Sequence, residues 1–186
     1  VASAENLARR YHYDEAHSRH VAELALSLFD QLESEHAMDH HARMLLEVAA
    51  TLHDIGTYIR ASGHHKHGQY IVENSEIFGI SRDDLRVISN VIRYHRKALP
   101  SSSHTSYVSL RREQRMQVLK LASILRIADA LDRGHARRVR RVNVELSEGD
   151  VILHCEVSGD TSIERYGFGA KADMFEEVFG LNVILS

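Results

Sequence analysis

Four side chains in this sequence of 186 residues have the types and the spacing of a metal site. His17, the adjacent pair His53 and Asp54, and Asp129 supply two imidazoles and two carboxylates in the order H…HD…D. Such ligands suit Zn²⁺, Mn²⁺, Fe or Mg²⁺, so the pattern indicates a divalent cation without fixing its identity. Four ligands leave positions open for water and phosphate oxygens, as metal-assisted hydrolysis requires.

These polar residues adjoin apolar stripes of helical period. His17 shares one face with Val21 and Leu24, and Asp129 follows Leu125 by four residues. Burying an unpaired carboxylate costs free energy, and a bound cation removes that cost. The pattern therefore predicts that helices bring the four side chains to one buried position.

Helical spacing extends from the start of the chain to about Gly134, and N-cap residues mark several helix starts. We expect Asp14, Asp39 and Ser81 to act as such caps. The predicted helices are a short one around Leu7, one from Asp14 to about Glu35, one from Asp39 to His53, one from His64 to about Ser75, one from Ser81 to His95, and a long one from about Leu110 to Arg133.

Beyond Gly134 the apolar period changes to two, which is typical of strands. Residues 142–146 and 151–155 alternate around a turn at 147–150, residues 161–179 are predicted to form a helix, and residues 181–185 a last strand. The predicted fold is mainly α, with a helical metal-binding domain over residues 1–136 and a small α+β subdomain over residues 137–186.

Three segments resemble the ligand motifs of the HD superfamily of metal phosphohydrolases: residues 17–22 (HSRHVA), 52–56 (LHDIG) and 126–132 (RIADALD). The resemblance implies an HD-type helical bundle in which His17, His53, Asp54 and Asp129 bind the metal. It also implies a catalytic role for Asp54, as a metal-bound carboxylate that orients the attacking water.

A narrower resemblance covers nearly the whole chain. Residues 64–67 (HHKH), 93–97 (RYHRK) and 171–176 (KADMFE) are similar to the C-terminal half of the exopolyphosphatase/guanosine pentaphosphatase family. In that family, hydrolysis of polyphosphate is credited to two actin-like domains ahead of this region, and no actin-like phosphate loops occur here. The resemblance allows for missing N-terminal actin-like domains and for a homodimer formed through the C-terminal segment. The single cysteine, Cys155, fits a reducing cytosol and thus a cytoplasmic protein.

Some HD enzymes use two additional histidines to hold a second metal ion. His64 and His95 are the candidates here, and His65 and His67 compete with His64 for the inward position. For substrate phosphates, cationic side chains nearby could supply contacts, although each of them taken singly is better explained as an ordinary surface charge. These candidates are Lys66, Arg96, Lys97 and Arg126.

Each candidate ligand has an alternative. His20 competes with His17, which could itself be a core histidine bonded to a backbone carbonyl. Asp129 could form a salt bridge with Arg126 instead, and Asp132 is an alternative acid, expected to be solvated or paired with an arginine.

Composition limits the partners. The net charge is −3, so nucleic acid is disfavoured, and the arginine run at 133, 137, 138, 140 and 141 is interpreted as a solvated connector. No apolar run is long enough to span a bilayer. The leading hypothesis is a metal-dependent phosphohydrolase for a nucleotide or polyphosphate. The alternative is a non-catalytic module that binds polyphosphate or a guanosine phosphate and dimerises.

Overall fold

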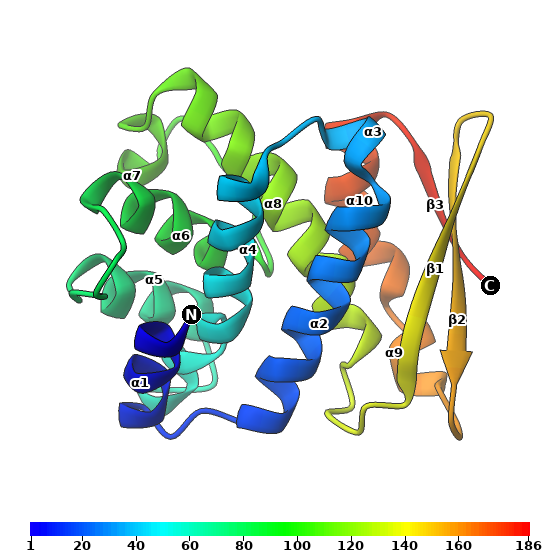
Figure 1. The fold of residues 1–186 in the computed structure, drawn as a ribbon, viewed down its shortest axis with the longest axis horizontal. Coiled ribbons are helices and arrows are strands. Elements are labelled where there is room, and N and C mark those ends of the chain that lie inside the picture. The colour runs from blue at the N-terminus through cyan, green and yellow to red at the C-terminus, as the bar shows by residue number, and fades with distance from the viewer.

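Helices make up most of the protein, and a small sheet lies near its C-terminus (Figure 1). The structure is a computed structural model that describes residues 1–186. The elements are α1 (Ala2–Arg10), α2 (Glu15–Gln31), α3 (Glu33–His36), α4 (His40–Leu52), the 3-10 helix η1 (Ile55–Tyr58), α5 (His64–Glu73), α6 (Arg82–Tyr94), α7 (Thr105–Val108), α8 (Arg112–Leu131), β1 (Val139–Ser147), β2 (Asp150–Val157), α9 (Ser162–Arg165), α10 (Phe168–Phe179) and β3 (Asn182–Leu185).

The core lies between α2, α4, α6 and α8, which contact one another along their apolar stripes. The stripe of α2 at Val21 and Leu28 is completely buried, as are Leu52 on α4 and Leu121 and Leu125 on α8. The predicted mainly helical fold is confirmed. Burial of these stripes is the main stabilising contribution, because most helical stability in proteins comes from packing an apolar face.

The predicted N-caps are confirmed. Asp14 accepts a hydrogen bond from the backbone N–H of His17, at 3.0 Å, and Asp39 and Ser81 cap α4 and α6 in the same way. The helix that begins at Asp14 ends earlier than expected, at Gln31. A separate turn, α3, follows and stops at Ala37, whose φ of +52° cannot continue a helix.

The sheet has the order β1-β2-β3, in which β1 and β2 are antiparallel and β2 and β3 are parallel. Val144 pairs with Leu153 across the predicted hairpin, and the predicted last strand is present. The single helix expected over residues 161–179 is two helices, α9 and α10. They are separated at Gly167, which has a φ of +80°.

The C-terminal segment packs directly on the helical body. Helix α10 lies along α8, and β1 lies along α2 (Figure 1). Ala172 and Phe175 anchor α10 in the core. This packing brings α10 to the end of α8 that carries Asp129.

Candidate metal centre

The four predicted ligands meet at one end of the bundle, the lower end in Figure 1. His17 lies in the first turn of α2, His53 and Asp54 directly follow α4, and Asp129 lies in the last turn of α8. The three helices converge there because their apolar stripes pack against one another. The structure therefore brings together, in one cluster, residues that the sequence pattern selected from three distant segments.

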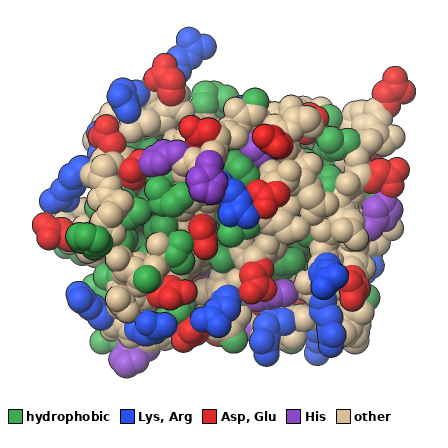
Figure 2. Space-filling model, viewed as in Figure 1, with side chains coloured by type: hydrophobic (Ala, Val, Ile, Leu, Met, Phe, Trp, Pro, Cys, Tyr) green, Lys and Arg blue, Asp and Glu red, His purple; other side chains and the backbone are tan.

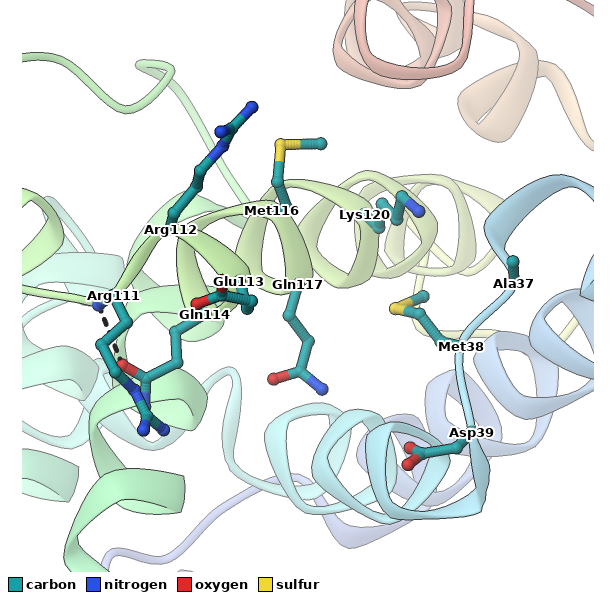
Figure 3. A pocket seen from close by; sticks show the side chains of 10 residues that line it. All are labelled: Ala37, Met38, Asp39, Arg111, Arg112, Glu113, Gln114, Met116, Gln117 and Lys120. Carbon is teal, nitrogen blue, oxygen red and sulfur yellow. Dashed lines mark hydrogen bonds between the residues drawn. The ribbon is translucent and has the colours of Figure 1, made fainter.

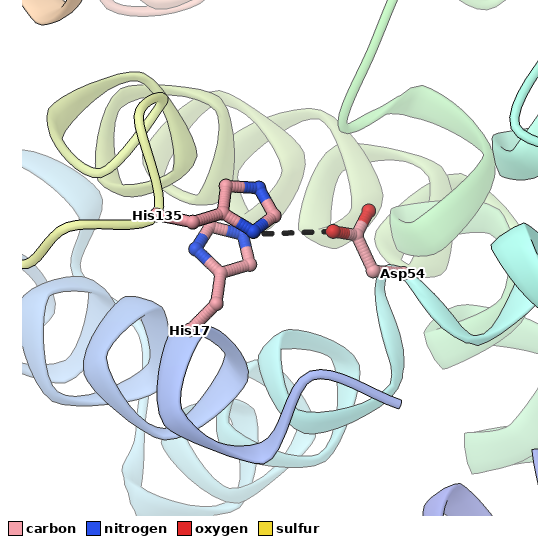
Figure 4. A group of neighbouring side chains, drawn as sticks. All are labelled: His17, Asp54 and His135. Carbon is pink, nitrogen blue, oxygen red and sulfur yellow. Dashed lines mark ion pairs between the residues drawn. The ribbon is translucent and has the colours of Figure 1, made fainter. Parts of the chain in front are cut away.

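Two ring nitrogens and two carboxylate oxygens face a common point. Nε2 of His17 lies 3.5 Å from Oδ2 of Asp54 and 3.6 Å from Oδ1 of Asp129. Nε2 of His53 lies 3.6 Å from each of the same two oxygens. Figure 4 shows the contact between His17 and Asp54. The matched separations describe a small cage of four ligand atoms.

The opposite nitrogen of each ring is already occupied. Nδ1 of His17 lies 2.8 Å from Oδ2 of Asp132, and Nδ1 of His53 lies 2.6 Å from the carbonyl oxygen of Ala50. Such contacts fix the ring orientation and the tautomer of metal-binding histidines. The buried Nε2 atoms of His17 and His53 have no hydrogen-bond partner. Buried polar atoms are rarely unpartnered, so these residues fit a bound cation.

A second cluster adjoins the first and shares Asp54. Oδ1 of Asp54 lies 3.0 Å from Nε2 of His64 and 3.9 Å from Nε2 of His95, and the two ring nitrogens are 3.3 Å apart. Backbone carbonyls of Ala61 and Ile92 contact the Nδ1 atoms of these rings. Each oxygen of Asp54 thus faces one cluster, as expected of a carboxylate that bridges two cations.

The orientation of α5 determines which of its three candidate histidines faces the second cluster. His64 faces Asp54, whereas His65 is buried without a partner for its Nδ1 atom and His67 is half-buried outside the cluster. Burial, together with the nearby positive charges of Arg93 and other residues, lowers the pKa of His65 to about 4. His65 is therefore a neutral core histidine at physiological pH.

Gly56 allows η1 to approach α5 closely. A Cβ atom on Gly56 would lie 1.9 Å from the carbonyl oxygen of His64 and 2.5 Å from the backbone nitrogen of Gly68. Only glycine fits that space, because both neighbouring groups are backbone. The glycine that follows His53-Asp54 in the sequence thus sets the position of His64.

Electrostatic coupling holds the cluster in its charged form without a metal. Burial disfavours protonation of His17, but its contacts with Asp129 and Asp132 and the charge of Asp54 outweigh burial and raise the pKa of His17 to about 10. Burial alone would raise the pKa values of Asp54 and Asp129, yet the surrounding histidines hold both well below the usual range. The carboxylates are therefore ready to bind a cation.

A cavity of about 270 Å³ opens over both clusters. Its lining contains both candidate carboxylates, three cationic side chains and only two apolar residues. The lining residues are Asp54, Thr57, Ala61, His64, Arg96, Asp129, Ala130, Arg133, His135 and Lys171. Figure 2 shows further Lys and Arg side chains along the lower edge of the molecule, over the same end of the bundle. The cavity suits an anion more than an apolar ligand.

A larger groove, of about 660 Å³, lies elsewhere (Figure 3). It runs between the segment Ala37–Asp39, ahead of α4, and the start of α8, where Arg111 and Gln114 lie. None of the predicted ligands or phosphate contacts lines it. The chemistry-bearing residues and the larger hollow are therefore separate.

Only one of the four side chains predicted to contact substrate phosphates lines the cavity. Arg96 lines the cavity, whereas Lys66 and Lys97 are exposed outside it. The expectation for Arg126 needs correction, because its buried guanidinium donates to the carbonyl oxygens of Tyr94, Lys97 and Ala98. These donors are used within the protein, so Arg126 secures the segment after α6 instead of facing the cavity.

The two residues that competed in the sequence with the predicted ligands, His20 and Asp132, lie outside the four-ligand cage. His20 contacts the carbonyl oxygen of Val139 on β1, at 2.8 Å, and so lies away from the cluster. Asp132 was expected to be solvated or paired with an arginine side chain, but it is completely buried. It accepts from the backbone N–H of Arg137, at 2.7 Å, and contacts His17. Asp132 therefore supports His17 from outside the cage.

Sequence reasoning missed three residues around the cavity. His135 stacks on His17 with ring centroids 3.6 Å apart and planes at 5° (Figure 4). Arg133 precedes it, and Lys171 contacts Asp129 at 2.9 Å. Arg133 was interpreted as part of a solvated arginine run but lines the cavity, and His135 belongs to a loop with no periodicity, so no pattern could place it beside His17. Lys171 lay within a family-like segment, which was its only signal.

The fold and the cluster define a helical domain with a candidate metal centre. Residues 1–163 match the family described as Ppx/GppA phosphatase, domain III, and the chain belongs to that family. No helix of the structure combines the length and the apolar character needed to cross a bilayer.

Curated relatives carry the name guanosine-5'-triphosphate,3'-diphosphate pyrophosphatase. One from Pseudoalteromonas translucida is 37% identical over 48% of this chain and 18% of its own length. One from Pseudoalteromonas atlantica is 31% identical over 64% of this chain and 24% of its own. One from Aliivibrio fischeri is 26% identical over 81% of this chain and 29% of its own. The chain thus spans less than a third of the relatives it matches.

Proposed function

We propose that this region is an HD-type metal phosphohydrolase domain that acts on a phosphate ester or anhydride. The observation that carries the proposal is the pair of buried, unpartnered Nε2 atoms of His17 and His53, each 3.6 Å or less from carboxylates of Asp54 and Asp129. Two imidazoles and two carboxylates form a ligand set for one divalent cation, Mn, Fe, Zn or Mg. His64, His95 and the second oxygen of Asp54 would hold another.

A divalent cation bound there would lower the pKa of a coordinated water and polarise a phosphoryl oxygen. Asp54 is proposed as the catalytic residue, because its carboxylate lies between both clusters and can orient the attacking water. Arg96 and Arg133 offset the negative charge of the phosphates from the walls of the cavity. Burial of the cluster strengthens each of these electrostatic contacts.

The substrate proposed is a nucleotide or a polyphosphate-type chain. The relatives are named for a pyrophosphatase acting on a guanosine nucleotide that carries several phosphates. The cationic cavity supports a phosphorylated substrate, since three of its ten lining residues are Arg or Lys. We further propose a cytoplasmic protein, because a single cysteine suits a reducing compartment, and one that can form a homodimer.

A second candidate function is a non-catalytic module that binds polyphosphate or a guanosine phosphate and supports dimerisation. It is favoured by the match to the third domain of a phosphatase family and by the short share of each relative that the chain spans. In that case the reaction belongs to other regions of the relatives, and the metal cluster has a structural or binding role.

Metal analysis of Asp54→Ala separates the two candidates. We would purify the wild type, Asp54→Ala and the control Asp83→Ala without added metal, then determine bound elements and hydrolysis of pyrophosphate, polyphosphate and guanosine nucleotides. Asp83 is an exposed acid in the first turn of α6. A hydrolase predicts metal and activity in the wild type and the control, with both lost in Asp54→Ala. Bound metal in the wild type, with no hydrolysis by any of the three proteins, supports the binding module.

Absence of metal from the wild type, even after reconstitution with Mn²⁺ or Zn²⁺, would contradict the metal centre itself. Circular dichroism spectra and thermal unfolding of the three proteins in chelator would show whether Asp54→Ala retains the fold.

A further inference from the structure

The C-terminal segment contributes a charged side chain to the metal centre. Lys171 is the fourth residue of α10, and its Nζ atom lies 2.9 Å from Oδ2 of Asp129. Both side chains are largely buried, with exposures of 14% and 16%. A lysine in that position is not a solvated surface charge, because the ion pair is mostly removed from water.

The two oxygens of Asp129 have different neighbours. Oδ1 faces Nε2 of His17 and Nε2 of His53, at 3.6 Å each, and Oδ2 faces Lys171. The ammonium group of Lys171 thus contacts Oδ2, the oxygen of Asp129 that does not face the cage. A carboxylate held in this way offers one oxygen to a cation and cannot turn to offer both.

The position of Lys171 depends on the packing of α10. Ala172, Met174 and Phe175 are buried, and α10 lies along α8 over the turn that carries Asp129. Gly167 starts α10 in a left-handed conformation, with a φ of +80°. These contacts fix the backbone at Lys171, so the ion pair is built into the fold.

We propose that Lys171 is a positioning residue that holds Asp129 as a one-oxygen ligand, which makes the C-terminal segment a structural part of the metal centre. This inference rests on the proposed metal site. Lys171 acts through Asp129, and its hydrogen bond resembles the outer contacts that orient ligands in other metal sites.

Two possible effects of Lys171, its charge and its orientation of Asp129, predict opposite changes in metal affinity when Lys171 is replaced. A positive charge near the cage repels a dication, so removing the charge alone would tighten metal binding. Loss of the hydrogen bond would instead free Asp129 to rotate, and loss of such an outer contact weakens metal binding by about 10–100-fold. The direction of the change therefore distinguishes a positioning residue from a bystander charge.

The experiment is a calorimetric titration with Co²⁺, together with the visible absorption spectrum of the bound ion. The variants are Lys171→Met, Lys171→Gln and Lys171→Arg, with Glu177→Gln as a control. Glu177 is an exposed residue on the same helix, and its change also removes one charge. Lys171→Gln removes the charge but retains an N–H donor, so it isolates the loss of charge; Lys171→Leu, which removes both, serves as the test variant if Lys171→Met does not fold.

For Lys171→Met we expect Co²⁺ affinity about 10–100-fold lower than in the wild type and a changed visible spectrum, because Asp129 would no longer be held in its orientation toward the cage. Lys171→Arg restores most of the affinity, and Glu177→Gln matches the wild type. Unchanged or tighter binding by Lys171→Met, with wild-type binding intact, would overturn this inference alone. A wild type that binds no Co²⁺ would overturn the metal site as well.

Discussion

His17 and Asp132 form a completely buried pair, in which Nδ1 of His17 lies 2.8 Å from Oδ2 of Asp132. The other oxygen of Asp132 accepts from the backbone N–H of Arg137, at 2.7 Å. Asp132 thereby connects a candidate metal ligand to the loop that carries His135. An acid that looked interchangeable with Asp129 in the sequence supports the ligand instead of replacing it.

We expect Asp132→Asn to weaken Mn²⁺ binding by about 10–100-fold with the fold retained, because an outer carboxylate raises the basicity of the histidine it contacts. Asn has the same shape but only one acceptor oxygen, so it can accept from Nδ1 of His17 or from the N–H of Arg137 but not from both; the change removes the charge and one hydrogen bond. Calorimetric titration with Mn²⁺ would measure the affinity, with Asp83→Asn as the control. Equal affinities in Asp132→Asn and the wild type would rule out this supporting role.

Metal binding should stabilise the protein. A ligand at about 100 times its Kd adds roughly 2.7 kcal/mol to the free energy of unfolding when it binds the folded state only. In a protein of this size, that corresponds to a Tm higher by about 5–10 °C. Thermal unfolding with and without saturating Mn²⁺ would measure the shift. Asp129→Asn should show little shift, because Asp129 faces the cage with its Oδ1 atom.

Protons should leave His17 when a metal binds. The carboxylates around it raise its pKa to about 10, so the ring is protonated in the metal-free protein at pH 7, and a cation must displace that proton. Metal affinity is therefore expected to increase between pH 6 and 9. Titrations at pH 7 in two buffers with different ionisation enthalpies would count the protons released. A release near zero would contradict the protonated state of His17.

The same raised pKa predicts the pH dependence of metal-free stability. Because the pKa of His17 is higher in the folded protein, its stabilising contribution is complete below the unfolded value, near 6.5. The contribution is lost as pH increases towards 10. Denaturant unfolding in chelator at pH 6 and pH 9 should show lower stability at pH 9. His17→Gln should have a smaller difference between the two pH values.

Much of the fold followed from periodicity and caps. The stripes of α2, α4 and α8, the cap at Asp14 and the hairpin strands are local features, and local patterns specify them. The break at Gly167 and the early end of α2 were missed, because helix ends depend on single backbone conformations that periodicity does not detect.

The candidate site could be predicted only where ligands lie on helices with an apolar stripe. His17 and Asp129 meet that condition, and His53 and Asp54 directly follow such a helix, α4. His135 does not, since it lies in a loop with a φ of +52°, and its stacking on His17 depends on tertiary structure. Arg126 misled the sequence interpretation, because an arginine beside a ligand motif suits phosphate and buried carbonyls equally well.

Gly56→Ala should weaken metal binding at the second cluster, which includes His64, more than at the first. The added Cβ would lie 1.9 Å from the carbonyl oxygen of His64, so α5 must shift and carry His64 with it. We expect a loss of about 1–3 kcal/mol in the free energy of unfolding, as for other overpacked positions. Mn²⁺ titration should show one site retained and the other weakened. Gly169→Ala, on α10, where an added Cβ has open space and no positive φ is required, controls for loss of glycine.

Arg126→Met should affect stability without affecting metal binding. The buried guanidinium donates to the carbonyl oxygens of Tyr94, Lys97 and Ala98, and methionine would leave all three unpaired. Unsatisfied buried acceptors cost about 1–3 kcal/mol each, partly relieved by water at the exposed residues, so we expect a total loss of about 2–4 kcal/mol. Denaturant unfolding of the metal-free protein would measure it, with Arg112→Met as an exposed control on the same helix.

The first cluster does not include Arg126, so Mn²⁺ affinity should stay within a few-fold of the wild type at temperatures where Arg126→Met is folded. A variant with wild-type stability and impaired hydrolysis would instead show that Arg126 contacts the phosphate, as the sequence alone suggested. The structure favours the first result, because three of the five N–H donors of Arg126 already bond carbonyl oxygens, and its side chain is buried and does not line the cavity.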